Sequence, residues 1–271
     1  MSSQEIDECR CCRADARFVL AGEVIGIPVK YFECEHCGFV QTEKPHWLEL
    51  AYSDAITHSD TGLVSRNLIN ARYTLATLRT LGMPKGKVLD FAGGYGLLVR
   101  LLRDKGVNAL WSDPFCENLH SKGFEHTGES VDLTTAFEVF EHLAEPEEEF
   151  DKMLDSGRNI LLSTVLIPRP APAHDSWWYY GHGHGQHVAF YRVSTLEAMA
   201  KRHNLHVISN GRNYHLFTDK KVNKQHWRVW LKMGKANAPW LYRGLKSLTK
   251  SDSLHQIQTA ANARTPSEPV T

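Results

Sequence analysis

Short apolar runs alternate with segments of helical periodicity between residues 65 and 218. The apolar runs end in turn-forming or acidic residues, and we expect strands at 87–92, 108–113, 131–140, 159–168, 205–209 and 214–218. The helical segments carry apolar residues three or four positions apart, and we expect helices at 65–82, 97–106, 145–157 and 194–204. Strands that alternate with helices form a mainly parallel sheet with helices on both faces, so the sequence predicts an α/β fold.

The pattern adds two details to this prediction. The run at 121–128 is weakly apolar and fits a short additional strand. The helix at 194–204 begins with Ser194 and Thr195, and Glu197 stands at capping-box spacing from Ser194. We therefore expect the helix to be capped by this pair.

Five of the six cysteines lie within the first 37 residues. Cys9 and Cys12 form one pair with two intervening residues, and Cys34 and Cys37 form another. Four thiolates at this spacing suit tetrahedral zinc and leave no open coordination position, so we expect a structural Zn²⁺ ion. The spacing favours Cys12 as a ligand, but the neighbouring Cys11 could replace it.

The segment between the two cysteine pairs has the composition of a β-hairpin. Residues 19–34 supply β-branched and aromatic side chains with glycine and proline between them, and Gly38 fits a tight turn after the second pair. A unit of about 45 residues buries too little core to be stable alone, and a bound metal supplies the missing stability. We therefore predict a small zinc-ribbon-like segment at 1–45.

Composition and charge restrict the compartment and the partners. The 31 basic residues balance the 31 acidic ones, so the chain lacks the basic excess that is typical of nucleic-acid-binding proteins. The N-terminus has no apolar signal-peptide core, and the longest apolar run is much shorter than the ~20 residues of a membrane span. We expect a cytoplasmic protein without a membrane span, acting on a small molecule. The sequence does not indicate its oligomeric state.

The turn after the first predicted strand of the sheet carries the sequence VLDFAGGYG, residues 88–96. The dinucleotide fingerprint G-x-G-x-x-G fails here, because Val99 stands where the third glycine would follow Gly94 and Gly96. No Gly-Lys-Ser/Thr sequence follows, so the turn is not a P-loop. A phosphate cradle therefore does not explain the glycines.

The same turn resembles motif I of the class I S-adenosylmethionine-dependent methyltransferases, read as Asp90-x-Ala92-x-Gly94-x-Gly96. Ala92 stands where the family usually has its first glycine. Two further family motifs have counterparts here, in the order in which the family carries them. The first is Asp113, the acidic residue that ends the next strand, and the second is the sequence AFEVFEHL at 136–143. The resemblance implies a Rossmann-like class I methyltransferase sheet and S-adenosyl-L-methionine as cofactor.

The resemblance also implies roles for individual residues. Asp90 would orient the amino end of the cofactor, Asp113 would accept hydrogen bonds from the two ribose hydroxyls, and Pro114 and Phe115 would pack on the adenine. The full set of cofactor-binding residues implied in this way is Tyr52, Asp90, Ala92, Gly93, Gly94, Gly96, Asp113, Pro114, Phe115, Phe137, Glu138 and His142.

The zinc segment and the linker at 51–62 resemble those of sugar and secondary-metabolite C-methyltransferases. In that group a tyrosine, here Tyr52, covers the cofactor. The resemblance spans roughly residues 9–218 and implies a methyltransferase domain at 46–218; we expect no counterpart of the large C-terminal domain of the ketosugar enzymes. Instead, 219–271 is expected to hold a basic amphipathic helix that packs on the domain, with disorder at 261–271.

The aromatic- and histidine-rich segment at 174–196 follows the predicted strand 159–168. The ketosugar enzymes have a Glu-His pair here whose histidine is the proposed base, and this chain has Gln186 and His187. We expect His187 to be the catalytic base, because histidine titrates near neutral pH; alternatively, it only hydrogen-bonds a loop or the cofactor. Glycine-separated histidines favour a flexible loop over a second metal site. The residues expected to shape the substrate pocket are Trp178, Tyr179, Tyr180 and His184.

The leading functional prediction is methyl transfer from S-adenosylmethionine to a small molecule. The resemblance favours a sugar or a related metabolite of glycan or natural-product biosynthesis. An RNA base methyltransferase with a zinc module is the first alternative, although the balanced charge argues against it. A non-catalytic binding protein that keeps the fold is the second alternative.

Overall fold

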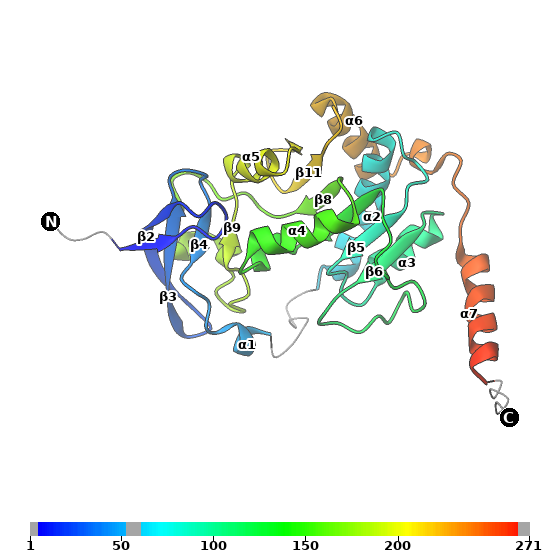
Figure 1. The fold of residues 1–271 in the computed structure, drawn as a ribbon, viewed down its shortest axis with the longest axis horizontal. Helices are drawn as coiled ribbons and strands as arrows, with labels where there is room; N and C mark the ends of the chain where they lie inside the picture. Colours follow the sequence, from blue (N-terminus) through cyan, green and yellow to red (C-terminus); the bar gives the residue numbers. More distant parts are fainter. Residues whose placement is uncertain (1–4, 53–60, 265–271) are drawn as a thin grey trace.

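The computed structural model describes residues 5–52 and 61–264, and its centre is a six-stranded sheet (Figure 1). The strand order is β10-β11-β8-β7-β5-β6. The four strands from β8 to β6 are parallel, and β11 and β10 are antiparallel to their neighbours. This arrangement confirms the predicted mainly parallel sheet. The strand bounds are β5 (Val88–Phe91), β6 (Ala109–Ser112), β7 (Leu133–Phe137), β8 (Ile160–Ser163), β10 (His206–Ser209) and β11 (Tyr214–Thr218).

Helices cover both faces of this sheet because its strands are apolar on both sides. In β8, Leu161 belongs to one buried cluster, whereas Ile160 and Leu162 belong to another. The first cluster is completed by α2 (Leu63–Thr80), α3 (Leu97–Asp104) and α6 (Lys224–Lys235). The second is completed by α4 (Pro146–Ser156) and α5 (Val193–Arg202). The expected packing of a C-terminal amphipathic helix on the domain is found in α6.

The N-terminal part forms an antiparallel sheet with the strand order β1-β2-β3-β4-β9. The hairpin expected between the cysteine pairs is present, and it turns at Ile25 and Gly26, both with positive φ. The last strand, β9, follows β8 of the central sheet along the chain and pairs Phe190 with Val40. The bounds are β1 (Ile6–Glu8), β2 (Asp15–Val24), β3 (Ile27–Cys34), β4 (Val40–Thr42) and β9 (Ala189–Phe190).

Buried side-chain hydrogen bonds reinforce the junction between the two sheets. Nη2 of Arg10 donates to the carbonyl oxygens of Thr42 and Val188, at 3.0 and 3.1 Å. Nε1 of Trp47 donates to the carbonyl oxygen of Gly185 at 2.8 Å. The segment around residues 185–190 is therefore held by the N-terminal sheet, and its position depends on that sheet.

The remaining elements are short, apart from α7 (Thr249–Arg264). Figure 1 shows α7 at the end of the molecule opposite the N-terminal sheet. Asp252 anchors it through ion pairs of 2.8 Å to Arg100 and to Arg103. Residues 261–264 are helical rather than disordered, and 265–271 lie outside the described residues. The short elements are α1 (Leu48–Ala51), η1 (Phe140–His142), η2 (His174–Ser176), η3 (Trp178–Tyr180) and η4 (Pro239–Tyr242).

Three local predictions were wrong. The strands expected at 131–140 and 159–168 end at Phe137 and Ser163; in the first, the chain turns at Glu138, whose φ is 56°. The weak run at 121–128 contributes a single bridge, between Glu125 and Trp111, instead of a strand.

The cap of α5 also differs from the prediction. The N-cap is Arg192, whose backbone N–H donates to Thr195 Oγ1 at 3.1 Å. The hydroxyls of Ser194 and Thr195 both donate to the carbonyl oxygen of Cys37. These two side chains tie the helix to the cysteine cluster, and of the two only Thr195 also takes part in the local cap.

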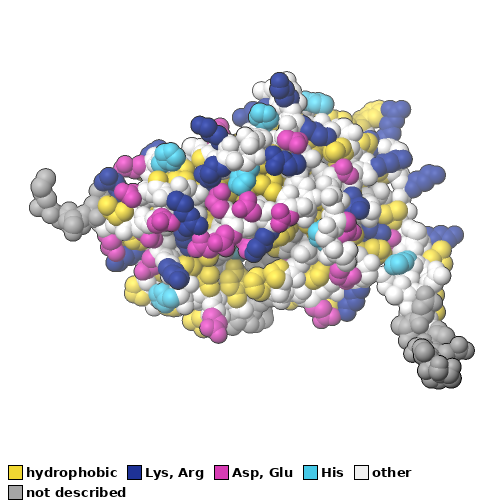
Figure 2. All heavy atoms as spheres, viewed as in Figure 1, with side chains coloured by type: hydrophobic (Ala, Val, Ile, Leu, Met, Phe, Trp, Pro, Cys, Tyr) yellow, Lys and Arg dark blue, Asp and Glu magenta, His cyan; other side chains and the backbone are white. Residues whose placement is uncertain are grey.

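Charges on the surface are mixed. Figure 2 shows Lys, Arg, Asp and Glu side chains interspersed over much of the visible face. Such a surface agrees with the equal numbers of basic and acidic residues in the sequence. Among the described residues, no helix is both long and apolar enough to cross a membrane.

Candidate active site

The turn between β5 and α3 lies at the carboxyl edge of the central sheet. Ala92, Gly94 and Gly96 all have positive φ, of 53°, 54° and 81°. A Cβ atom at Gly94 would meet no atom within 4 Å, whereas one at Gly96 would lie 2.5 Å from Ser121 Oγ. Gly96 is thus required by packing, and Gly94 presents bare backbone to open space. Ala92 adopts the left-handed conformation that glycine takes more readily, which explains the usual glycine of the family motif.

Asp90 is buried beneath this turn. Its Oδ1 atom accepts a hydrogen bond of 2.8 Å from the hydroxyl of Thr135 on the neighbouring strand. Burial, and to a smaller extent the nearby charge of Asp113, raises the pKa of Asp90 to about 7. A buried carboxyl of this kind favours a cationic partner, because a positive charge would stabilise its ionised form.

Asp113 joins the ends of β5 and β6. Its Oδ2 atom accepts from the backbone N–H of Gly94 at 2.9 Å, and Oδ1 accepts from the N–H groups of Phe115 and Cys116 at 2.8 and 2.9 Å. Nε1 of Trp111 donates to the carbonyl oxygen of Gly94 at 2.8 Å. These bonds fix the turn and the carboxylate relative to each other. Oδ1 already accepts two of these bonds, but Oδ2 keeps a second lone-pair site, so Asp113 can still accept a hydrogen bond from a ligand.

The two residues expected to pack on an adenine lie on the loop after Asp113. Pro114 is exposed, and the side chain of Phe115 is 91% exposed. A fully solvated Phe ring next to the turn offers apolar area that a flat ligand would cover.

At the end of β7, the structure brings together further predicted residues. Phe137 packs near the ring of Tyr214, and the carboxyl of Glu138 accepts a hydrogen bond of 2.5 Å from Ser163 Oγ. Nδ1 of His142 lies 3.0 Å from the hydroxyl of Tyr52, which comes from the start of the predicted linker. Most of that linker, residues 53–60, lies outside the described residues.

The predicted substrate-pocket residues are divided between the surface and the interior. Trp178 is 74% exposed, whereas Tyr179 and Tyr180 are buried. The hydroxyl of Tyr180 donates to the carbonyl oxygen of Pro172 at 3.0 Å, and its ring packs on Phe190. Tyr180 therefore lies in the core of the N-terminal sheet in this structure.

His187 lies at the centre of a cluster of rings. Its ring centroid is 4.9 Å from that of His142 and 4.7 Å from that of His184. Nδ1 of His187 lies 2.6 Å from the carbonyl oxygen of Tyr179, so this nitrogen carries the hydrogen. Burial lowers the pKa of His187 well below its usual value, and the nearby His142 lowers it further. The imidazole is thus neutral, and Nε2 keeps its lone pair.

Glu141 is a site residue that sequence reasoning missed. It is fully buried, and its Oε1 atom accepts a hydrogen bond of 2.7 Å from the hydroxyl of Tyr179. Its Oε2 atom is buried without a hydrogen-bond partner among the described residues. Burial and the neighbouring Glu138 raise the pKa of Glu141 to about 8. The only signal in the sequence was its place beside His142 in the 136–143 motif.

A model of the methyltransferase domain family matches residues 66–210, which is more than half of the chain. The chain belongs to the class I methyltransferases. The match confirms the resemblance that the three motifs indicated, and it includes Asp90, Asp113 and His142. The expected methyltransferase fold is confirmed by the family match and the parallel sheet.

Among solved structures, the methyltransferase is similar to several distant relatives. The magnesium protoporphyrin IX methyltransferase of Synechocystis is 14% identical, with a TM-score of 0.43 over 63% of this chain and 92% of that one. An O-methyltransferase family protein of Burkholderia thailandensis is 15% identical, with a TM-score of 0.48 over 66% and 64%. The 1,6-didemethyltoxoflavin-N1-methyltransferase of the same organism is 13% identical, with a TM-score of 0.45 over 76% and 100%. No curated protein matches significantly.

The N-terminal cysteines of the methyltransferase form a second candidate site. The sulfur atoms of four cysteines lie within 4.8 Å of one another: those of Cys9, Cys12, Cys34 and Cys37. The Sγ atoms are 3.7 Å apart for Cys9 and Cys37, and 3.5 Å apart for Cys12 and Cys34. Four converging thiols in a buried setting fit a tetrahedral metal such as Zn²⁺. The Sγ atom of Cys11 instead lies 3.8 Å from Glu147 Oε1.

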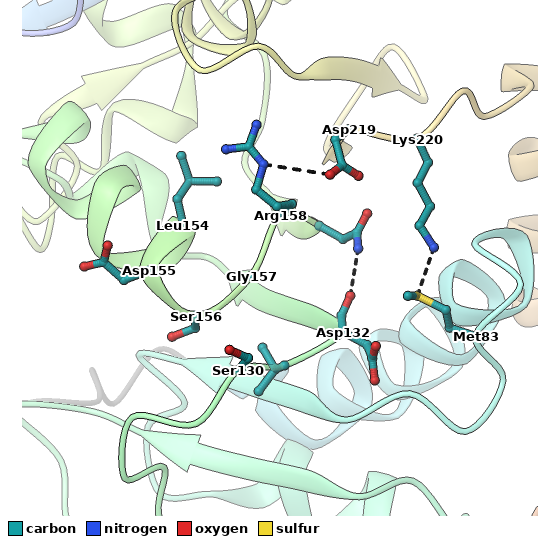
Figure 3. A pocket seen from close by; sticks show the side chains of 12 residues that line it. Met83, Ser130, Asp132, Leu154, Asp155, Ser156, Gly157, Arg158, Asp219 and Lys220 are labelled. Atoms are coloured by element: carbon teal, nitrogen blue, oxygen red, sulfur yellow. Dashed lines mark hydrogen bonds and ion pairs between the residues drawn. The ribbon is translucent and has the colours of Figure 1, made fainter.

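Two surface pockets of the methyltransferase lie away from these residues. One is lined by residues at the amino ends of β7 and β8, among them Asp132, Arg158 and Asp219 (Figure 3). Another lies between α3 and α7. In parallel α/β sheets ligands bind at the carboxyl ends of the strands, so the first pocket is on the opposite edge from the Asp90 turn.

Proposed function

We propose that this methyltransferase binds S-adenosyl-L-methionine over the turn at 92–96 and transfers its methyl group to a small molecule. The observation that carries the proposal is the rigid connection between the turn and Asp113, with open space beside Gly94. A ligand without phosphates can lie directly against such a turn, because only bare backbone faces it. The family match supports the reaction type.

The proposed cofactor contacts follow the positions of the carboxylates. Asp90 interacts with the cationic amino end of the cofactor, and Asp113 accepts hydrogen bonds from the ribose. Phe115 covers the adenine from the exposed loop. Tyr52, which reaches His142 from the edge of the described chain, covers the methionine end.

The bound cofactor supplies an electrophilic methyl group on its sulfonium. The protein must hold the acceptor in line with that group, and it must lower the cost of removing the acceptor's proton. We propose that His187 acts at the acceptor, because its Nε2 atom carries a lone pair in the neutral ring. This nitrogen can take the proton itself or bind a metal ion that acidifies the acceptor.

We propose a sugar or a related metabolite of glycan or natural-product biosynthesis as the acceptor. The exposed ring of Trp178 supports a cyclic acceptor, since aromatic faces stack on sugars and other rings. The cysteine cluster is proposed to hold a structural Zn²⁺ ion that keeps the N-terminal sheet folded.

The test is a screen for labelled-methyl transfer from S-adenosylmethionine, with nucleotide sugars, free sugars and RNA as acceptors. We expect label in a sugar fraction and none in RNA. Label only in RNA would contradict the proposed acceptor class but not methyl transfer. Absence of label in every fraction, together with absence of cofactor binding, would contradict the proposed function itself.

A further inference from the structure

Three potential metal ligands converge beside the proposed cofactor site. Glu141 and His142 belong to η1, which follows β7, and His187 belongs to the segment that leads into β9. One ligand atom of each of the three residues lies within 4.8 Å of the other two. Two imidazoles and one carboxylate form a donor set that binds divalent first-row transition metals and leaves coordination positions open.

A backbone carbonyl oxygen faces Nδ1 of each of the two histidines. Nδ1 of His187 lies 2.6 Å from the carbonyl oxygen of Tyr179, and Nδ1 of His142 lies 3.1 Å from that of Gln186. Because a carbonyl oxygen can only accept, Nδ1 of His187 carries the hydrogen and its Nε2 keeps a lone pair. Nδ1 of His142 also lies 3.0 Å from the hydroxyl of Tyr52, which can donate or accept. Metal-binding histidines are commonly oriented by this kind of outer hydrogen bond.

Glu141 gives the second, independent observation. The hydroxyl of Tyr179 orients its carboxyl group through Oε1, while Oε2 is buried with no partner among the described residues. An unpaired carboxyl oxygen in the interior is costly unless a donor or a cation satisfies it. Tyr179 therefore positions two of the three groups, Glu141 through its hydroxyl and His187 through its carbonyl.

We propose that Glu141, His142 and His187 bind a divalent first-row transition metal ion, distinct from the zinc of the cysteine cluster. The open coordination positions would take a hydroxyl oxygen of the acceptor and lower the pKa of that hydroxyl, so that its proton passes to solvent water and the oxygen takes the methyl group from the sulfonium, which leaves as S-adenosylhomocysteine; the favoured acceptor class therefore carries a hydroxyl group. This last step rests on the proposed methyl transfer, whereas metal binding itself does not. The assignment gives His187 the role of a ligand in place of the catalytic base expected from the sequence.

A second group of potential ligands provides a comparison within the same protein. His174, Asp175 and His182 also lie within 4.8 Å of one another. However, the side chain of Asp175 is fully exposed, and Nε2 of His182 is engaged at 2.9 Å by the carbonyl oxygen of His174. Asp175 faces solvent and His182 is already bonded to the backbone, so this cluster serves as a control.

The experiment measures binding of Mn²⁺ to the full chain with its zinc retained, by the loss of the free-Mn²⁺ electron paramagnetic resonance signal. Mn²⁺ prefers oxygen and imidazole ligands and competes poorly for thiolates, so the cysteine cluster does not interfere. The variants are E141Q and H187Q, which nearly keep the side-chain volume, and H182Q is the matched control. Thermal unfolding of each variant shows that it is folded.

We expect about one Mn²⁺ ion per wild-type chain, unchanged affinity in H182Q, and affinity at least ~10-fold lower in E141Q and in H187Q. Mn²⁺ should raise the unfolding temperature of the wild type and of H182Q only. Equal affinity in wild type and E141Q, or loss of binding in H182Q alone, would overturn the proposal. Binding of S-adenosylhomocysteine, measured without Mn²⁺, shows separately whether the proposed function fails.

Discussion

The backbone N–H of Gly94 donates a hydrogen bond of 2.9 Å to Oδ2 of Asp113. This bond connects the turn after β5 with the end of β6, and the indole of Trp111 repeats the connection from the other side of Gly94. The carboxylate is thus held before any ligand arrives. Preorganisation of this kind lowers the cost of binding, because few side chains must be ordered.

Replacing Asp113 with Asn should weaken cofactor binding. Asn keeps the shape of the side chain but loses the charge and one acceptor, and a hydrogen bond to a charged group contributes ~1.5–3 kcal/mol. We expect S-adenosylhomocysteine to bind ~10- to 100-fold more weakly, as measured by titration calorimetry. Glu117→Gln, which removes an exposed ion pair with Lys122, is the control and should bind normally. Equal affinity in the two variants would exclude Asp113 from the site.

Cofactor affinity should depend on pH through Asp90. The pKa of this carboxyl is about 7 in the free protein, and only its ionised form attracts a cationic group. Affinity for S-adenosylhomocysteine should therefore fall as the pH is lowered from 8 to 6, and Asp90→Asn should be weaker and lack most of this dependence. An identical pH profile in wild type and variant would show that another group is responsible.

The same carboxyl should reduce the stability of the free protein at high pH. Its pKa is higher in the folded chain, where it is about 7, than in the unfolded chain, where it is that of an ordinary carboxyl group. At pH values between these two pKa values, the folded state therefore binds more protons than the unfolded state. Stability from this group is therefore lost as the pH rises through about 7. Without cofactor at pH 8, we expect Asp90→Asn to raise the unfolding free energy by more than ~1 kcal/mol. A lower value for the variant in denaturant titrations would contradict the burial argument.

The cysteine cluster should bind one metal through Cys12 and not through Cys11. In Cys12→Ser, we expect substantial loss of the zinc found by elemental analysis and a lower unfolding temperature, because metal binding contributes to folding. Cys11→Ser should keep about one zinc per chain. The reverse result would show that Cys11 is the ligand.

Trp47 should couple the N-terminal sheet to the segment that carries His187. Trp47→Phe leaves the carbonyl oxygen of Gly185 without its donor and opens a small cavity, at a cost of ~1–3 kcal/mol. Methyl transfer should fall as well, since that segment shifts. Trp240→Phe, at an exposed position, should change the unfolding free energy by less than ~0.5 kcal/mol. If Trp47→Phe behaved like this control, the junction would not support the site.

Much of the fold followed from local sequence patterns. The strand–helix alternation, the hairpin between the cysteine pairs and the helix α6 each depend on residues that are near one another in the sequence. The spacing rule for zinc ligands also selected Cys12, whose sulfur lies in the cluster. The strand lengths at 131–140 and 159–168 were overestimated, because apolar composition does not reveal a turn such as the one at Glu138.

The candidate site was only partly predictable, because its contacts join distant segments. Nothing near Tyr179 in the sequence shows that its hydroxyl meets Glu141, or that β9 extends the N-terminal sheet. Tyr180 looked like a pocket residue, yet it packs in the core beside Phe190. Such pairings are decided by tertiary packing, which periodicity and spacing do not encode.

The most direct test of the central claim is titration calorimetry of S-adenosylhomocysteine into the full chain, with Asp113→Asn beside it. The account predicts binding at about one site per chain in the wild type and at least ~10-fold weaker binding in the variant. Absence of binding in a folded wild-type protein, or binding that Asp113→Asn leaves unchanged, would contradict it.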